Sequence, residues 1–162
     1  MKYLLGILVI SDSSFHNNRV STTQDLIKEF LISKFDTCIV KIIPDHPVDI
    51  EDTLSQWVDL LHLDLILSTG GTGASPRDFT PEATMKILDK EIPGISEYLR
   101  IKTIVNTPYA CLSRGKSGFR KQTLIINLPG SAKAVREYLE LLDPILVHAI
   151  EIIQGKVNRC GG

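Results

Sequence analysis

Short apolar runs that alternate with helical patterns are the feature that most constrains how this 162-residue chain can fold. The first run, Leu4 to Ser11, is almost continuously aliphatic, which is typical of a strand buried on both faces. Three further runs have the same character: Cys38 to Ile43, Leu63 to Ser68 and Thr123 to Leu128. Thr22 to Lys34 and Ile50 to Leu61 instead place apolar residues at helical spacing. This alternation predicts an α/β fold, a three-layer α/β/α sandwich around a mostly parallel central sheet.

The second half of the chain continues the pattern with more helix. Pro81 to Leu88 is predicted to be a short helix, and another is predicted to begin at Pro93-Gly94. Tyr109 to Ser113 is predicted to be a strand, followed by a polar, basic loop from Arg114 to Gln122. The remaining segments are predicted to form two helices, Ala132 to Leu142 and Pro144 to Gly155.

Length and composition limit the class of protein. The length suits one domain, residues 1–157, which buries about two-thirds of its unfolded surface without crosslinks, and residues 158–162 are expected to be a flexible tail. A formal net charge of −1 gives no electrostatic reason to bind nucleic acid or an anionic membrane. No apolar run approaches the roughly 18 residues that span a bilayer. Three widely spaced cysteines fit a reducing compartment, so a cytoplasmic protein that acts on small molecules is expected.

A glycine-rich segment after the third apolar run carries most of the functional signal. Gly70-Gly71-Thr72-Gly73 matches neither the Walker loop nor the dinucleotide fingerprint. The glycines alone fit a tight turn with positive φ as well as a backbone that approaches a ligand closely. Arg77-Asp78 favours the ligand, because a cation and a carboxylate beside an open turn suit a phosphate and a metal. Thr80 and Pro81 are expected to cap and begin the next helix.

Three aspartates follow the ends of predicted parallel strands: Asp12, Asp45 and Asp78. Because the carboxyl ends of parallel strands lie along one edge of a sheet, these side chains are expected to share a cleft. Mg²⁺ commonly binds one or two carboxylates together with substrate phosphates and water. The aspartates are therefore candidate metal partners, and the alternative is that each one caps its own loop.

A second anion site is indicated where the Thr123 to Leu128 strand runs through Pro129-Gly130 into a helix. Free N–H groups at a helix N-terminus attract phosphate, and Lys133 in the first turn adds a full charge. Ser131 fits this anion site and also fits an ordinary N-cap. Ser113-Arg114 upstream is a candidate source of further donors, whereas the basic loop as a whole also fits a solvated face.

Other reactive residue types have structural interpretations. His148 lies on an apolar helix and is expected to pack rather than to act as a base. Cys111 falls within a predicted strand, which favours a buried, inert thiol. Trp57 is expected in the core. Neither Ser11 nor Ser113 has an evident Ser-His-Asp arrangement, so serine hydrolase chemistry fits poorly.

Taken together, three motifs in this order resemble the molybdenum cofactor biosynthesis family, which includes the bacterial molybdopterin adenylyltransferases and the G domain of gephyrin. The motifs are Gly70-Gly71-Thr72-Gly73 through Arg77-Asp78 to Ala83, then Leu112-Ser113-Arg114 with Gly118, then Leu124 to Ala134 with Asn127-Leu128-Pro129-Gly130-Ser131 inside it. The resemblance extends from Val9 to the helix that Gly155 ends, which is nearly the whole chain.

The resemblance implies a usually trimeric α/β/α domain that binds molybdopterin and Mg-ATP. It implies transfer of AMP to the terminal phosphate of molybdopterin, with release of pyrophosphate. The implied catalytic and metal-binding residues are Asp45 and Asp78, with Mg²⁺ as the cofactor and ATP as a substrate. The implied nucleotide-binding residues are Ser11, Asp12, Gly70, Gly71, Thr72 and Gly73. The implied molybdopterin-binding residues are Arg77, Ser113, Arg114, Pro129, Gly130, Ser131 and Lys133.

Two positions depart from the family pattern. Many relatives carry an Asp and a Gly where this chain has Ser21-Thr22-Thr23-Gln24, so the nucleotide contact of that loop does not carry over. Many carry Pro where this chain has Ala132, which keeps the N–H groups of the helix start open. Three alternatives stay open: a molybdopterin-binding or molybdate-insertion helper without adenylylation, a trimeric scaffold, and a hydrolase of the competence-damage type. The molybdate-insertion protein of the same pathway is a candidate partner.

Overall fold

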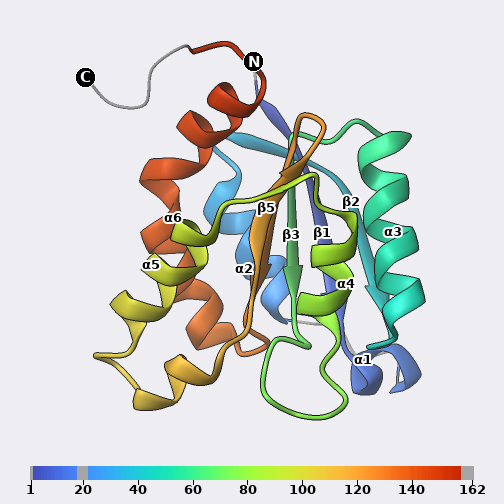
Figure 1. The fold of residues 1–162 in the computed structure, drawn as a ribbon, viewed down its shortest axis with the longest axis vertical. Coiled ribbons are helices and arrows are strands. Elements are labelled where there is room, and N and C mark those ends of the chain that lie inside the picture. Colours follow the sequence, from blue (N-terminus) through green and yellow to red (C-terminus); the bar gives the residue numbers. More distant parts are fainter. Residues whose placement is uncertain (1, 18–21, 158–162) are drawn as a thin grey trace.

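A single six-stranded sheet forms the centre of the protein, whose structure is a computed structural model that describes residues 2–17 and 22–157 (Figure 1). The strand order is β2-β1-β3-β6-β5-β4. The bounds are β1 Tyr3–Ile10, β2 Phe35–Ile43, β3 Leu65–Thr69, β4 Lys90–Glu91, β5 Ser117–Arg120 and β6 Thr123–Leu128. Strands β2, β1, β3 and β6 are parallel, whereas β5 is antiparallel to β6 and to β4. The predicted mostly parallel sheet is confirmed.

Helices cover both faces of this sheet (Figure 1). Their bounds are α1 Asp12–Asn17, α2 Thr22–Leu31, α3 Pro47–Asp59, α4 Thr80–Ile87, α5 Pro93–Thr103, the 3₁₀ helix η1 Pro108–Leu112, and α6 Ala132–Ile153. Buried side chains of α2, α5 and α6 share one hydrophobic cluster with the sheet, and those of α3 and α4 share a second. The three-layer sandwich is therefore confirmed. None of the described helices is both long and apolar enough to cross a bilayer.

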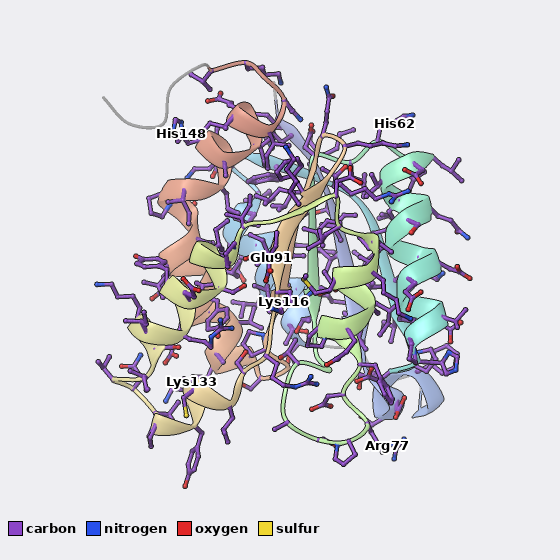
Figure 2. All side chains as sticks on the ribbon, viewed as in Figure 1. His62, Arg77, Glu91, Lys116, Lys133 and His148 are labelled. Carbon is purple, nitrogen blue, oxygen red and sulfur yellow. The ribbon has the colours of Figure 1, made fainter. Side chains whose placement is uncertain are left out.

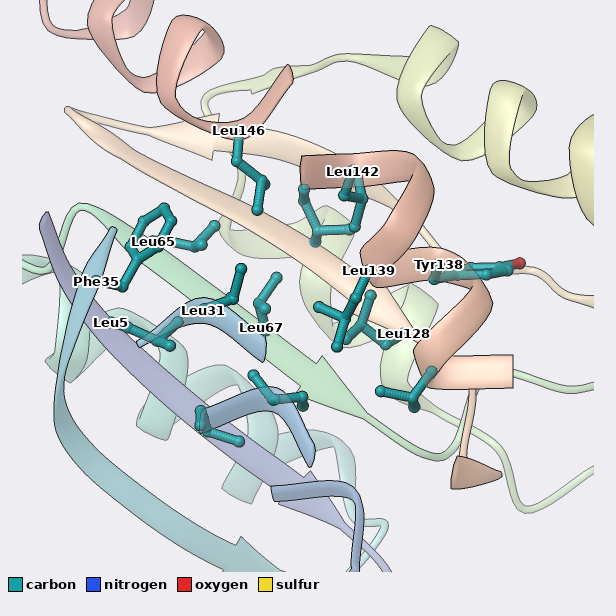
Figure 3. Packing of buried hydrophobic residues seen from close by; sticks show 14 of the residues in the cluster. Leu5, Leu31, Phe35, Leu65, Leu67, Leu128, Tyr138, Leu139, Leu142 and Leu146 are labelled. Atoms are coloured by element: carbon teal, nitrogen blue, oxygen red, sulfur yellow. The ribbon is translucent and has the colours of Figure 1, made fainter. Parts of the chain in front are cut away.

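The two-residue period of the strands divides the core between these clusters. Leu65 and Leu67 point to the side of α6 and pack with its leucines, as Figure 3 shows. Ile66, between them, packs in the cluster of α3 and α4. Trp57 belongs to that second cluster and is only 4% exposed, which confirms its predicted core position. Each fully buried leucine or isoleucine contributes about 1.5–3 kcal/mol, so these two clusters hold the strand ends in place.

The predicted strand over Tyr109 to Ser113 is wrong, because this segment is the 3₁₀ helix η1. Pro108 begins it, where a missing N–H costs nothing and the fixed φ suits a helical turn. Tyr109 and Leu112 are 76% and 54% exposed, so their apolar character does not mark a buried strand. Cys111 on the same turn is exposed, which overturns its prediction as a buried thiol.

The predicted loop from Arg114 to Gln122 contains strand β5. Arg120 pairs with Thr123, so Lys121 and Gln122 make a two-residue turn between β5 and β6. Lys121 has φ 52°, a conformation that Asn or Gly adopts more readily than lysine. The usual sequence signal for a hairpin is therefore missing here.

The two predicted C-terminal helices are one continuous helix, α6, with Pro144 inside it. Proline cannot donate to the carbonyl four residues earlier, which belongs to Glu140. Glu140 lies on the exposed side of α6, where water can satisfy that carbonyl. Buried Leu142 and Leu146 hold the helix on the sheet on either side of the proline. The short helix α1 was not predicted, and Ser21, Cys160 and the expected tail at 158–162 lie outside the described residues.

Candidate active site

The carboxyl ends of β1, β2, β3 and β6 lie along one edge of the sheet, where the chain reverses its direction of winding. From β1 the chain goes to β2 on one side, and then returns to β3 on the other side of β1. Ligands in open α/β sheets bind at the crevice that this reversal creates. The glycine segment follows β3 at this point, and the Pro129-Gly130 turn follows β6 beside it.

The glycine turn requires its glycines for steric reasons. Gly70 and Gly71 have φ values of 99° and 63°, in the left-handed region that other residues rarely adopt. A Cβ on Gly70 would collide with the carbonyl of Ile10, and one on Gly71 would collide with the side chains of Asp45 and Thr80. The hydroxyl of Thr80 donates to the carbonyl of Gly70 at 2.9 Å, so it fastens the turn and does not cap α4 as predicted. The turn thus holds backbone, carboxylate and helix start in close contact.

Asp12, Asp45 and Asp78 converge at this edge, as their strand-end positions predicted. The backbone N–H of Asp45 donates to Oδ1 of Asp12 at 2.9 Å. Oδ1 of Asp45 accepts from the backbone N–H of Phe79, the neighbour of Asp78, at 3.1 Å. Arg77 pairs with Asp12, with 2.6 Å between Nη2 and Oδ2. Asp78 caps its own loop at the N–H of Ser75, whereas Asp12 and Asp45 accept from the backbone of other connections, so the three form one cluster.

The pKa of Asp45 is raised to about 6, chiefly by burial and also by the charges of Asp78 and Asp12, against the lowering effect of the Phe79 N–H and of Arg77. The carboxylate of Asp45 is half-buried between the glycine turn and the start of α4. Neighbouring negative charges and desolvation both disfavour the ionised form. A cation placed among these carboxylates would relieve that repulsion.

The raised pKa predicts a specific pH dependence of stability. Below about pH 4, Asp45 is protonated in both the folded and the unfolded state, so its contribution to the free energy of unfolding is at its full value there. As the pH rises through about 6 the folded protein must ionise a carboxyl group that prefers its proton, so this contribution to the free energy of unfolding is lost. Asp45→Asn should keep the acceptor for Phe79 and flatten that loss, measured by urea unfolding between pH 4 and 7.

The control for this measurement is Asp52→Asn, which makes the same chemical change at an exposed position of α3. The wild-type slope should persist in that variant. An unchanged slope in Asp45→Asn would contradict the assignment of the titration to Asp45.

A cavity of about 350 Å³ opens beside the aspartate cluster. Of the predicted site residues it brings together those of three segments: Gly71, Thr72, Gly73 and Asp78 of the glycine segment, Ser113 after η1, and Pro129, Gly130 and Ser131 after β6. The volume is in the range of pockets that hold a small ligand. Segments up to 60 residues apart in sequence therefore line one cavity, at the edge where the parallel topology predicts that they meet.

The cavity also has walls that the sequence prediction missed. They come from α5, η1 and the first turns of α6: Thr103, Thr107, Tyr109, Ala110, Leu112, Ala134, Glu137 and Tyr138. Ala134, Glu137 and Tyr138 stand at i, i+3 and i+4, which puts them on one face of a helix. With Ser131 as the N-cap of the helix, this spacing could have indicated that the three residues form one wall of the site.

A smaller hollow of about 130 Å³ lies at the same edge, between the ends of β1, β3 and β6. Ser11, Gly70 and Gly130 line it together with Thr23 and Thr69. Gly130 borders both hollows, and a Cβ built on it would stand 3.6 Å from Cα of Gly70. Gly130 therefore lies between the two hollows.

Two predicted cationic residues lie at this end of the molecule without lining either hollow. Figure 2 shows Arg77 and Lys133 at the same end of the protein and His148 at the other. Lys133 is exposed, and its side chain makes no ion pair or hydrogen bond with any residue that the structure describes. Ser131 caps α6, since its side chain accepts from the N–H of Ala134, so both interpretations of this serine fit. His148 is exposed rather than packed, which corrects its prediction.

The basic residues that follow η1 are paired with carboxylates of the chain itself. Arg114 pairs with Glu82, Lys116 with Glu91 at 2.9 Å, and Arg120 and Lys121 both with Asp59. These two cations lower the pKa of Asp59 to about 2. The segment is therefore neither a free solvated face nor a cluster of unpaired donors.

The carboxylates fit a cation that brings some of its own ligands. Among the described residues no group of three or more His, Cys, Asp or Glu side chains is arranged to hold a metal. Asp45 and Asp78 are near enough for one charge to raise the pKa of the other. Two carboxylates suit Mg²⁺, which completes its shell with phosphate oxygens and water, and do not suit a metal that needs a full protein cage.

A parallel sheet with a ligand-sized cavity at its carboxyl edge defines the class of open α/β ligand-binding proteins. Residues 6–148 match the profile of the family described as "Probable molybdopterin binding domain". The chain therefore belongs to this molybdenum cofactor biosynthesis family, and the resemblance drawn from the motifs is confirmed.

Individual relatives agree with this assignment. The chain is 36% identical over 155 residues to the molybdopterin adenylyltransferase of Helicobacter pylori, across 93% of this chain and 88% of that protein. It is 41% identical to the molybdenum cofactor synthesis protein cinnamon of Drosophila melanogaster across 94% of this chain, but it spans only 26% of that longer protein. The crystal structure of the molybdopterin biosynthesis enzyme MoaB of Thermus thermophilus superposes with a TM-score of 0.89 at 46% identity, over 94% of this chain and 97% of that one.

Proposed function

We propose that this protein is a molybdopterin adenylyltransferase, in which a terminal phosphate oxygen of molybdopterin attacks the α-phosphorus of ATP. A new P–O bond forms, the bond between the α-phosphorus and the bridging oxygen breaks, and pyrophosphate leaves. The relatives named molybdopterin adenylyltransferase, at 36% and 39% identity, support this reaction. The observation that carries the proposal is the shared cavity of the glycine segment, Asp78, Ser113 and the Pro129–Ser131 turn beside Asp45.

The chemistry needs position and charge compensation rather than a covalent nucleophile. Two anionic reactants must be brought together, so the protein's work is to orient them and to stabilise developing negative charge. Asp45 and Asp78 would hold Mg²⁺, which supplies charge neutralisation at the phosphates when it is bound. With a pKa of about 6, Asp45 is mostly ionised at neutral pH, which permits this role.

We assign molybdopterin to the larger cavity and part of the nucleotide to the smaller hollow. Ser11, Asp12 and Gly70 to Gly73 would contact the nucleotide at the smaller hollow and the glycine turn. Ser113, the Pro129-Gly130-Ser131 turn and the start of α6 would hold molybdopterin in the larger cavity, with Lys133 and Arg77 supplying positive charge near its phosphate. The mostly apolar walls of Tyr109, Leu112 and Tyr138 suit a flat heterocycle.

Glu137 is the cavity residue that suits the pterin ring itself. It follows Ala134 by one turn of α6 and lines the cavity, with no ion-pair partner among the described residues. A carboxylate is a poor neighbour for a phosphate, but its two oxygens match the adjacent N–H donors of an aminopyrimidinone edge. Glu137 would therefore orient molybdopterin with its ring away from the phosphate-binding N-terminus of α6.

Glu137→Gln should raise the KM for molybdopterin by about 10-fold or more and leave the KM for ATP unchanged. The reason is that the NH₂ group of glutamine would face one of the two N–H donors of the pterin ring, so that donor would lose its acceptor. Steady-state kinetics with each substrate varied in turn would measure this. Glu140→Gln, one turn along on the exposed side of α6, is the matched control. Equal effects of both variants would argue against recognition by Glu137.

The reaction itself can be tested with purified protein, molybdopterin, ATP and MgCl₂. Adenylylated molybdopterin and pyrophosphate should form in equal amounts, and neither should form without a divalent cation. Tight binding of molybdopterin with no product would instead support a binding protein, which the family description also fits. Hydrolysis of ATP without molybdopterin would favour a hydrolase.

Three further expectations from the resemblance stay predictions: a homotrimer, a cytoplasmic location, and association with the protein that inserts molybdate. Light scattering of the purified protein would determine whether it is a trimer.

A further inference from the structure

Arg114 makes the densest set of polar contacts at the edge of the cavity. Its Nε donates to the carbonyl of Gly73 at 2.7 Å, and its Nη2 donates to the carbonyl of Asp78 at 2.9 Å. Its Nη1 pairs with the carboxylate of Glu82 at the start of α4. Its backbone N–H donates to the carbonyl of Thr72 at 2.8 Å. The guanidinium nitrogens and the amide are thus bound to the connection between β3 and α4 and to the first turn of α4.

Few other contacts hold residues 74–77, the outer part of the connection between β3 and α4. Residues 74–77 are exposed, and their described hydrogen bonds are within the turn from Ser75 to Asp78 or from Arg77 to Asp12. The contacts of Arg114 enclose this exposed part on both sides, at Gly73 and at Asp78. The backbone that carries the Asp78 carboxylate is therefore fixed from the opposite wall of the cavity.

A second arginine fixes the segment that carries Arg114. Arg100 of α5 donates from Nη1 to the carbonyl of Gly115 at 3.1 Å and lies 3.4 Å from the carbonyl of Ser113. Both carbonyls flank Arg114. The chain of contacts runs from α5 through residues 113–115 to the glycine segment, so it spans the two sides of the cavity.

We propose that Arg114 is a positioning residue that sets the place of the Asp78 carboxylate, and that it is not a ligand for the phosphate of molybdopterin. Three of its five N–H donors go to two carbonyls and a carboxylate, and the negative charge of that carboxylate opposes a phosphate at the same guanidinium. Arg114 is absent from the described lining of the cavity, although Ser113 beside it is present. Lys133, whose side chain has no described partner, remains available to a phosphate.

This inference rests on the proposed function, and the comparison of Arg114→Lys with Lys133→Ala separates the two roles. Arg114→Lys keeps the charge but cannot reproduce three directed bonds. It should lower kcat by about 10- to 100-fold and raise the Mg²⁺ concentration for half-maximal rate, because a displaced carboxylate positions the metal and phosphates poorly. Its Kd for molybdopterin should stay within about twofold of wild type, whereas Lys133→Ala should weaken that Kd by about 10-fold.

A measurement that needs no catalysis keeps the inference testable if the enzyme assay fails. Amide hydrogen exchange in residues 72–79 should become faster in Arg114→Lys, while β3 and β6 keep wild-type protection. Glu82→Gln removes one partner and leaves both carbonyl bonds, so it should show a smaller effect. Weakened molybdopterin binding with unchanged Mg²⁺ dependence and unchanged exchange would overturn the positioning role, and absence of product from the wild-type enzyme would overturn only the proposed reaction.

Discussion

Asp78→Asn is expected to lower the rate of adenylyl transfer at limiting Mg²⁺ by about 100-fold or more, because it removes a charge where the metal and the phosphates meet. The fold should survive, since Oδ2 of Asp78 accepts only one backbone bond, from Ser75 at 3.2 Å, and the asparagine oxygen can accept it as well. Product formation should be measured across a Mg²⁺ titration, together with the Kd of molybdopterin, which should change little.

Asp52→Asn serves again as the control, because it makes the same change at an exposed position outside the aspartate cluster. A wild-type rate for Asp78→Asn at limiting Mg²⁺ would remove Asp78 from the metal site. A loss of rate that excess Mg²⁺ fully restores would be the expected pattern for a weakened metal ligand.

Gly70→Ala is expected to destabilise the protein by about 2 kcal/mol or more, a large fraction of the stability of a domain of this size. Alanine is strained at φ 99°, and its Cβ would collide with the carbonyl at the end of β1. Moving the turn would also pull Thr80 and the start of α4 away from the aspartates, because the Thr80 hydroxyl is bonded to the Gly70 carbonyl. Urea unfolding would measure the loss.

Gly94→Ala is the matched control for this substitution. Gly94 lies in the first turn of α5 at an ordinary φ, and a Cβ built there meets no atom within 4 Å. Alanine favours helix more than glycine, so stability should be unchanged or slightly higher. A similar loss at both positions would show that the strained turn is not the cause at Gly70.

The edge that carries the site could be predicted because its signals are local. Gly70 and Gly71 follow a buried strand, and parallel topology alone brings Asp12, Asp45 and Asp78 to one side. Side-chain distances were not needed for that step.

The opposite wall of the cavity could not be predicted, because its residues look ordinary in sequence. Tyr109 and Leu112 are apolar, and their sequence pattern is typical of a strand. In the structure both are exposed and line a ligand-sized cavity. The role of Arg114 depends on contacts with residues 32 to 41 positions away, which no local pattern encodes. The hairpin of β5 and β6 could not be predicted either, because Lys121 occupies the left-handed turn position where Asn or Gly is usual.

Gly130 stands between the two hollows, within van der Waals reach of Gly70. Two molecules bound on either side of Gly130 would therefore lie close to each other at this edge of the sheet. A bulkier residue at position 130 would act as a spacer that keeps them apart.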